Sequence, residues 1–286
     1  MKISRKLALM IVAGAILQLS VYLYLDQILF APTAAFTVKD TEQTQVVSGG
    51  KAYYSRDRKY MANITEDAVE LYTMPGRSLV RSISLNGQKV SYFKWLEDRN
   101  LALMATYDEE SANGKVVLSQ LNPLDDKHEM STKVEKLPKG SKIHDVAYST
   151  ATNVIYMQVQ TAVKPEAYRV YRTDANRELS RIFFNTNKVG RIGVLPYQDI
   201  MIFDNLENNT IVARNGDGSW QVISPTAGKY RMIGVDAKSD VFIARLNTEG
   251  LAENVLKGNA KGSFVPHKKL PAPVEAVTLQ IADVTE

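Results

Sequence analysis

The residues of this chain that could bind a charged ligand lie at matching positions of a repeated sequence pattern. When the repeats are aligned, one position holds Tyr92, Asp145, Arg191 and Met232, and the position before it holds Ser91, His144, Gly190 and Arg231. Guanidinium and imidazolium groups bind anions through charge-assisted hydrogen bonds. The residues expected to converge on an anionic group, or alternatively to pair with one another, are His144, Asp145, Arg191 and Arg231.

The repeated pattern consists of a strand-ending residue, four turn residues, a polar residue and then an apolar strand. Its clearest copy runs from Trp95 to Asn100 and precedes the apolar residues 101–104. The polar residues that end the copies are 59, 100, 153, 199 and 240, at intervals of 41 to 53 residues. This period is typical of a four-stranded propeller blade. In such a blade the strand before the pattern would line a central channel.

The form Trp-x-x-Asp-x-Asn followed by an apolar strand resembles the TolB-type propeller repeat. The resemblance covers roughly residues 46–270 and is best in residues 95–104, whereas residues 148–157 keep the aromatic residue and the strand only. The last two copies keep only the spacing. The resemblance implies a fold more than a function. It implies that the first residues of the copies pack between blades, namely Tyr54, Trp95, Tyr148, Val194 and Val235.

The predicted fold is therefore all-β, a β-propeller of about five or six four-stranded blades. Residues 36–47 and 274–284 both have strand-like sequences and flank the repeats. They would close the fifth blade or form a sixth, which would remove exposed strand edges. A two-sheet β-sandwich is the alternative fold.

A charge-free segment, residues 7–25, precedes the repeats. A helix of this length matches the hydrocarbon thickness of a bilayer. Because Lys2, Arg5 and Lys6 come before it, the positive-inside rule places the N-terminus in the cytoplasm. We expect a cytoplasmic tail (1–6), a transmembrane signal-anchor helix (7–30), a linker or closing strand (31–45) and an extracytoplasmic domain (46–286). A cleaved secretory signal and a buried core helix are the alternatives.

The composition excludes several classes of site. The chain has no cysteine, which rules out disulfides, thiolate metal sites and a cysteine nucleophile. Its net charge of +4 comes in part from Lys2, Arg5 and Lys6, so the rest of the chain has no electrostatic footprint for nucleic acid.

Motifs for catalysis are also missing from the sequence. It has no Gly-x-Ser-x-Gly elbow, no phosphate-binding glycine loop and no His-Glu-x-x-His motif. The three histidines, His128, His144 and His267, lie in different repeats. The sequence therefore predicts no catalytic residues, no metal, no cofactor and a chain that is not an enzyme.

These observations favour a membrane-anchored, extracytoplasmic binding or scaffold protein of the bacterial cell envelope, which contacts a protein partner through a propeller face. One alternative is a ligand-sensing ectodomain that signals through a membrane partner. Another is a glycan-acting enzyme, which would need two carboxylates around its substrate. Only Asp145 is acidic among the aligned channel positions.

Overall fold

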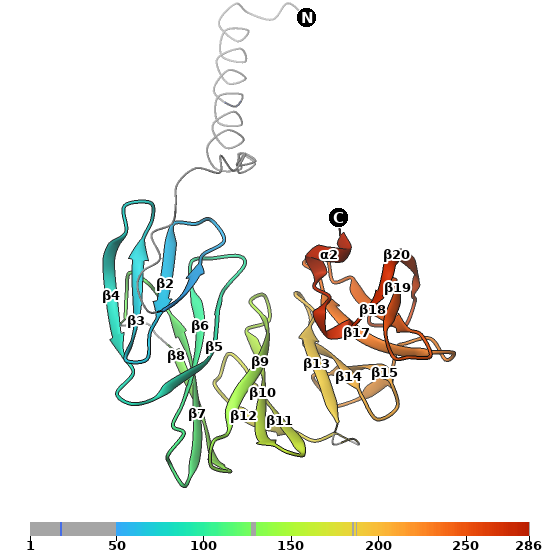
Figure 1. Cartoon of the computed structure of the whole chain (residues 1–286), viewed down its shortest axis with the longest axis horizontal. Coiled ribbons are helices and arrows are strands. Elements are labelled where there is room, and N and C mark those ends of the chain that lie inside the picture. The colour runs from blue at the N-terminus through green and yellow to red at the C-terminus, as the bar shows by residue number, and fades with distance from the viewer. Residues whose placement is uncertain (1–17, 19–49, 127–129, 185, 187, 286) are drawn as a thin grey trace, which may run out of the picture. The chain divides into compact units, whose positions relative to one another are not determined.

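The computed structural model describes residue 18 and residues 50–126, 130–184, 186 and 188–285 (Figure 1). By its internal contacts the chain forms two units, Met1–Val46 and Val47–Glu286. The described part of the second unit folds into five antiparallel sheets of four strands each, which confirms the all-β prediction and the number of strands per blade. Within each sheet the strands follow chain order, as in the blades of a β-propeller.

The strands have the following bounds. The first sheet contains β1 (Lys51–Tyr54), β2 (Tyr60–Ile64), β3 (Ala68–Thr73) and β4 (Ser78–Ser84). The second contains β5 (Lys89–Trp95), β6 (Ala102–Tyr107), β7 (Gly114–Leu121) and β8 (Met130–Leu137). The third contains β9 (Lys142–Ser149), β10 (Val154–Val163), β11 (Glu166–Thr173) and β12 (Leu179–Ile182). The fourth contains β13 (Val189–Val194), β14 (Ile200–Asn205), β15 (Thr210–Asn215) and β16 (Trp220–Val222). The fifth contains β17 (Lys229–Val235), β18 (Val241–Leu246), β19 (Ala252–Gly258) and β20 (Val265–Val274).

Each sheet contacts the next through the first strand of its meander. The strands β1, β5, β9, β13 and β17 touch one another in this order. A separate apolar cluster fills each space between consecutive sheets, from the first pair to the fourth and fifth. The apolar residues that recur in the central strands thus form one core layer per pair of sheets, which accounts for the repeat.

The fifth sheet is covered on its other face by the C-terminal segment. This segment forms a 3-10 turn, η2 (Ala276–Thr278), and a short helix, α2 (Ile281–Thr285), in red in Figure 1. The prediction of a strand over residues 274–284 is therefore wrong. Its buried residues are Ala276, Leu279 and Val284, at intervals of three and five rather than at the alternate positions of a strand. The other expected closing strand, residues 36–47, lies outside the described residues.

No helix in the described part of the chain is long and apolar enough to cross a bilayer. The expected anchor, residues 7–30, lies outside the described residues apart from Gln18.

The repeated pattern forms hydrogen bonds between neighbouring sheets. The indole N–H of Trp95 donates to the carbonyl of Tyr53 at 3.0 Å, and the Asn100 side-chain amide donates to Asp57 at 3.0 Å. In a later copy the hydroxyl of Ser149 donates to the carbonyl of Pro196. The turn residues of the pattern thus do more than reverse the chain, because they fix one sheet against the next.

The first residues of the copies differ in burial. Trp95 is buried between the first and second sheets, and Val194 lies in the cluster between the third and fourth. Tyr148 and Val235 are partly buried against the neighbouring clusters. Tyr54 is 40% exposed, and its neighbour Tyr53 takes the packing position instead.

The two tryptophans of the chain provide a matched test of this packing. Trp95 is 6% exposed and its ring lies 5.8 Å from Phe93, whereas Trp220 is 55% exposed. We expect Trp95→Ala to lower the free energy of unfolding by about 3–5 kcal/mol, because it leaves a cavity and removes the bond to Tyr53. Trp220→Ala should change it by about 0.5 kcal/mol or less. Urea denaturation of both full-length variants measures the difference, and equal losses would contradict this role of Trp95.

Candidate functional site

A cavity of about 850 Å³ lies beside β9, β13 and β17, and we call it the inner-strand cavity. All four residues of the predicted binding set line it: His144, Asp145, Arg191 and Arg231. Its other charged lining residues are Glu166, Asp204, Lys229, Glu249 and Glu275. The four residues selected by aligning the repeats therefore line the same cavity.

Irregular strand pairing explains why these positions face a cavity. On β9, Asp145 and Ile143 pair with consecutive residues of β10, so His144 is an extra residue. On β13, Gly190 and Arg191 occupy a similar irregularity. A β-bulge bends its strand and redirects side chains away from the regular alternation. His144 on β9 and Arg191 on β13 therefore lie at β-bulges.

Arg191 holds the C-terminal segment in place. Its Nη1 donates to the carbonyl oxygens of Ile233 at 2.7 Å and Leu279 at 3.0 Å, and its Nη2 donates to that of Val277 at 3.0 Å. These bonds join β13, β17 and the η2 turn. Because its donors are directed at backbone carbonyls, Arg191 is a structural residue of the cavity wall.

Arg231 is held differently, and some of its donors have no hydrogen-bond partner among the described residues. Its Nη2 donates to Oδ1 of Asn209 at 2.7 Å, and its Nη1 donates to the carbonyl of Tyr230 at 2.8 Å. His144 is exposed, with its ring 5.3 Å from that of Tyr168. Among the described residues, no ion pair within 4.0 Å joins Arg231, Lys229 or His144 to a carboxylate. The side chains of the binding set therefore do not neutralise one another by direct pairing.

Two carboxyl groups of the cavity have raised pKa values. Asp204 is 3% exposed, and burial raises its pKa to about 7, although the N–H of Met232, the charge of Arg231 and the N–H of Arg191 oppose the rise. Burial also raises the pKa of Asp145, against the N–H of Val146 and the charge of His144. A carboxyl group that titrates near neutral pH, as Asp204 does, can hold or release a proton at a site.

Asp204 also joins two sheets. Its Oδ2 accepts a hydrogen bond from the backbone N–H of Arg191 at 3.2 Å, and its Oδ1 accepts one from that of Met232. In the preceding repeat Gln158 acts similarly, since its side-chain amide donates to the carbonyls of Val189 and Gly190. Asp204 and Gln158 each lie five residues after the polar residue that ends the pattern. This shared position relative to the repeated pattern could have identified both residues from the sequence. An alignment of the inner strands alone does not include it.

The inner-strand cavity has more acidic lining residues than the sequence indicated. The aligned inner-strand positions contain Asp145 as their one acid, whereas the cavity also has Asp204 on β14, Glu166 on β11, Glu249 in the turn after β18, and Glu275 after β20. These residues come from other strands and from turns, so an alignment of the innermost strands does not include them. The cavity therefore has several acidic lining residues, whereas the aligned positions indicated one.

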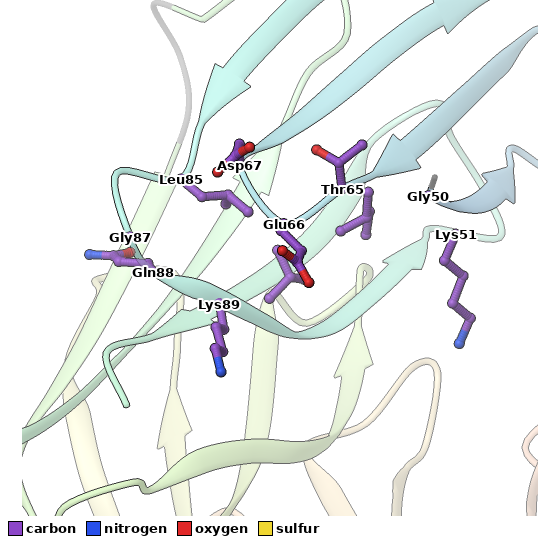
Figure 2. Close-up of a pocket in the computed structure, with 11 residues that line it drawn as sticks. Gly50, Lys51, Thr65, Glu66, Asp67, Leu85, Gly87, Gln88 and Lys89 are labelled. Atoms are coloured by element: carbon purple, nitrogen blue, oxygen red, sulfur yellow. The ribbon is translucent and has the colours of Figure 1, made fainter. Parts of the chain in front are cut away.

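A different hollow, of about 920 Å³, lies by the first sheet and contains none of the predicted binding set. Figure 2 shows Lys51, Glu66 and Lys89 around it, from β1, the turn after β2, and β5. Lys89 forms an ion pair with Glu109, and the hydroxyl of Thr65 donates to the carbonyl of Ala68. Lys89 and Thr65 are thus already partnered, and the inner-strand cavity, which contains the predicted set, is the stronger candidate.

The histidines do not form a common site among the described residues. His144 lines the inner-strand cavity, and Nε2 of His267 forms a hydrogen bond with the carbonyl of Val284 at 2.8 Å. His128 lies outside the described residues. Within the part of the chain that the structure describes, no group of three or more His, Asp or Glu side chains could hold a metal ion.

Comparison with known proteins identifies the fold. No family model matches the sequence, and no curated protein matches it. Among solved structures, a prolyl endopeptidase aligns over 78% of this chain and 35% of its own, with 14% identity and a TM-score of 0.55. Dipeptidyl peptidase 4 of Porphyromonas gingivalis aligns over 78% of this chain and 39% of its own, with 13% identity and a TM-score of 0.54. TolB of Acinetobacter baumannii aligns over 77% of this chain and 54% of its own, with 14% identity and a TM-score of 0.43.

The chain spans little more than a third of the length of either peptidase, and the likeness concerns the fold. The prediction that the chain is not an enzyme is nevertheless wrong, because structures that share this fold include enzymes. The absence of familiar motifs was the reason for that prediction. Motifs of a hydrolase domain say nothing about groups that a propeller itself brings together from separate strands.

The buried carboxyl group of Asp204 should make stability depend on pH. Its pKa is about 7 in the folded chain and 3.8 for an unperturbed aspartate, so the folded state binds the proton more tightly. Its contribution is therefore complete below pH 3.8 and is lost as the pH rises to about 7, which amounts to roughly 4 kcal/mol. In Asp204→Asn this loss should be absent. Urea denaturation between pH 4 and 8 measures it, and parallel curves for the two proteins would contradict the assignment.

Proposed function

We propose that this chain is a membrane-anchored, extracytoplasmic binding protein of the cell envelope, which binds a protein partner at the face that contains the inner-strand cavity. Residues 7–30 anchor it in the bilayer. The observation that carries the proposal is that cavity, where charged side chains gather without direct ion pairs among the described residues. Arg231 and Lys229 are available to a partner, because among the described residues neither forms an ion pair and Arg231 uses only part of its hydrogen-bonding capacity.

The basic side of the cavity is the proposed contact for an acidic group of the partner. Arg231 is oriented by Asn209 and has donors without a partner in the described part of the chain, and Lys229 lies near it on β17. Arg191 contributes its charge, while its hydrogen bonds hold the wall in shape. A fixed guanidinium loses little conformational freedom on binding, which favours recognition of a carboxylate or a phosphate.

We expect Arg231→Gln to weaken partner binding by about 10- to 100-fold, because a charge-assisted hydrogen bond contributes about 1.5–3 kcal/mol. The matched control is Arg58→Gln, since Arg58 is exposed in the turn between β1 and β2 and does not line the cavity. Full-length protein is cross-linked in its native membrane, purified, and its captured proteins are quantified. Equal capture by both variants would exclude this cavity as the contact.

The proposed topology can be tested with the cysteine-free chain as a background. Ser4→Cys places a single thiol before the apolar segment, and Ser263→Cys places one at an exposed site in the turn before β20. With a membrane-impermeant maleimide and intact cells, we expect Ser263→Cys to be labelled and Ser4→Cys to be labelled only after lysis. Labelling of Ser4→Cys in intact cells, or protection of Ser263→Cys, would contradict the topology.

A further inference from the structure

A cavity of about 260 Å³ between the second and third sheets forms a separate site, which we call the inter-sheet groove. Two cross-strand rows of residues form its walls. The row on the second sheet is Leu103, Gln120 and Met130, and the row on the third sheet is Tyr148, Ile155 and Thr173. Directly paired residues of antiparallel strands point to the same face of a sheet, so each row presents its side chains to the other.

The groove is lined mainly by apolar and uncharged polar side chains. Leu96, Leu103 and Leu118 are buried at its base, with 4% exposure or less. Two charged residues occur in the lining: Asp174, which pairs with Arg172 at 3.2 Å, and Arg177, which is exposed. Because Asp174 is already paired and Arg177 is exposed to solvent, a charged ligand would lose its hydration against the buried leucines with little compensation, so the walls favour a neutral molecule.

Thr173 supplies an unused polar group at this apolar surface. It is 4% exposed, and its Oγ1 has no hydrogen-bond partner among the described residues. A buried hydroxyl without a partner is destabilising, because it has lost its bonds to water. A ligand hydroxyl or amide in the groove would restore that hydrogen bond.

We propose that the inter-sheet groove binds a small neutral molecule that has an apolar body and one hydrogen-bonding group, with the polar group meeting the hydroxyl of Thr173. The volume suits one ring or two fused rings, since an engineered cavity of about 150 Å³ holds benzene. The groove shares no lining residue with the inner-strand cavity. The inference is thus independent of the proposed partner contact.

The probe is 2-naphthol, with naphthalene as the analogue that lacks the hydroxyl, and binding to the full-length protein is followed by probe fluorescence. Thr173→Val keeps the shape of the side chain and removes its hydroxyl. We expect this variant to bind 2-naphthol about 10-fold more weakly and naphthalene equally well. The matched control is Thr106→Val, because Thr106 is also buried but lies on the other face of β6, toward the first sheet.

A second variant tests the location without relying on Thr173. Thr132 lines the groove on β8 and is half-buried, so Thr132→Trp should fill the space and abolish binding of both probes. The proposal is overturned if 2-naphthol does not bind saturably, or if Thr173→Val and Thr132→Trp bind it as the unaltered chain does. It is also overturned if Thr132→Trp instead abolishes self-association of the chain, which would make the groove an interface between copies.

Discussion

Each four-stranded sheet of this protein has two faces, and burial of those faces against neighbours is the constraint on which the rest of the structure depends. A single small sheet cannot bury enough apolar surface to be stable alone, so each relies on the next. Side chains that reach across the spaces hold the register between sheets, as Trp95 does with Tyr53 and Gln158 does with Val189. At the end of the series the C-terminal segment replaces the next sheet and covers the fifth.

The candidate sites follow from the same constraint. The inner strands bulge, and the bulges free backbone groups that side chains of the preceding sheet then satisfy. Asp204 does this at the cost of being buried, which raises its pKa to about 7. The wall of the inner-strand cavity therefore contains two kinds of charged residue. Arg191 holds the wall together through bonds to backbone carbonyls, whereas Arg231 can contact a ligand or partner.

Much of this fold could be predicted because each repeat carries its own information. The alternation of apolar residues and the turn at Trp95 to Asn100 are local, and they indicated the strands correctly. The segment 274–284 was mispredicted because its apolar residues suit a strand or a helical turn equally, and the fifth sheet offered a face for the latter. The acids of the cavity were missed because Glu166, Glu249 and Glu275 come from turns and strand ends that only the folded chain brings together.

The sequence by itself determined the all-β class, the number of repeats and the positions of His144, Asp145, Arg191 and Arg231, because these depend on periodicity along the chain. Only the tertiary structure decided what each of these residues does. It directed Arg191 to backbone carbonyls. Among the described residues it left Arg231 with free donors and Thr173 without a hydrogen-bond partner in a groove between two sheets. The physical reason is that burial and hydrogen-bond partners are set by neighbours that lie tens of residues away in the chain.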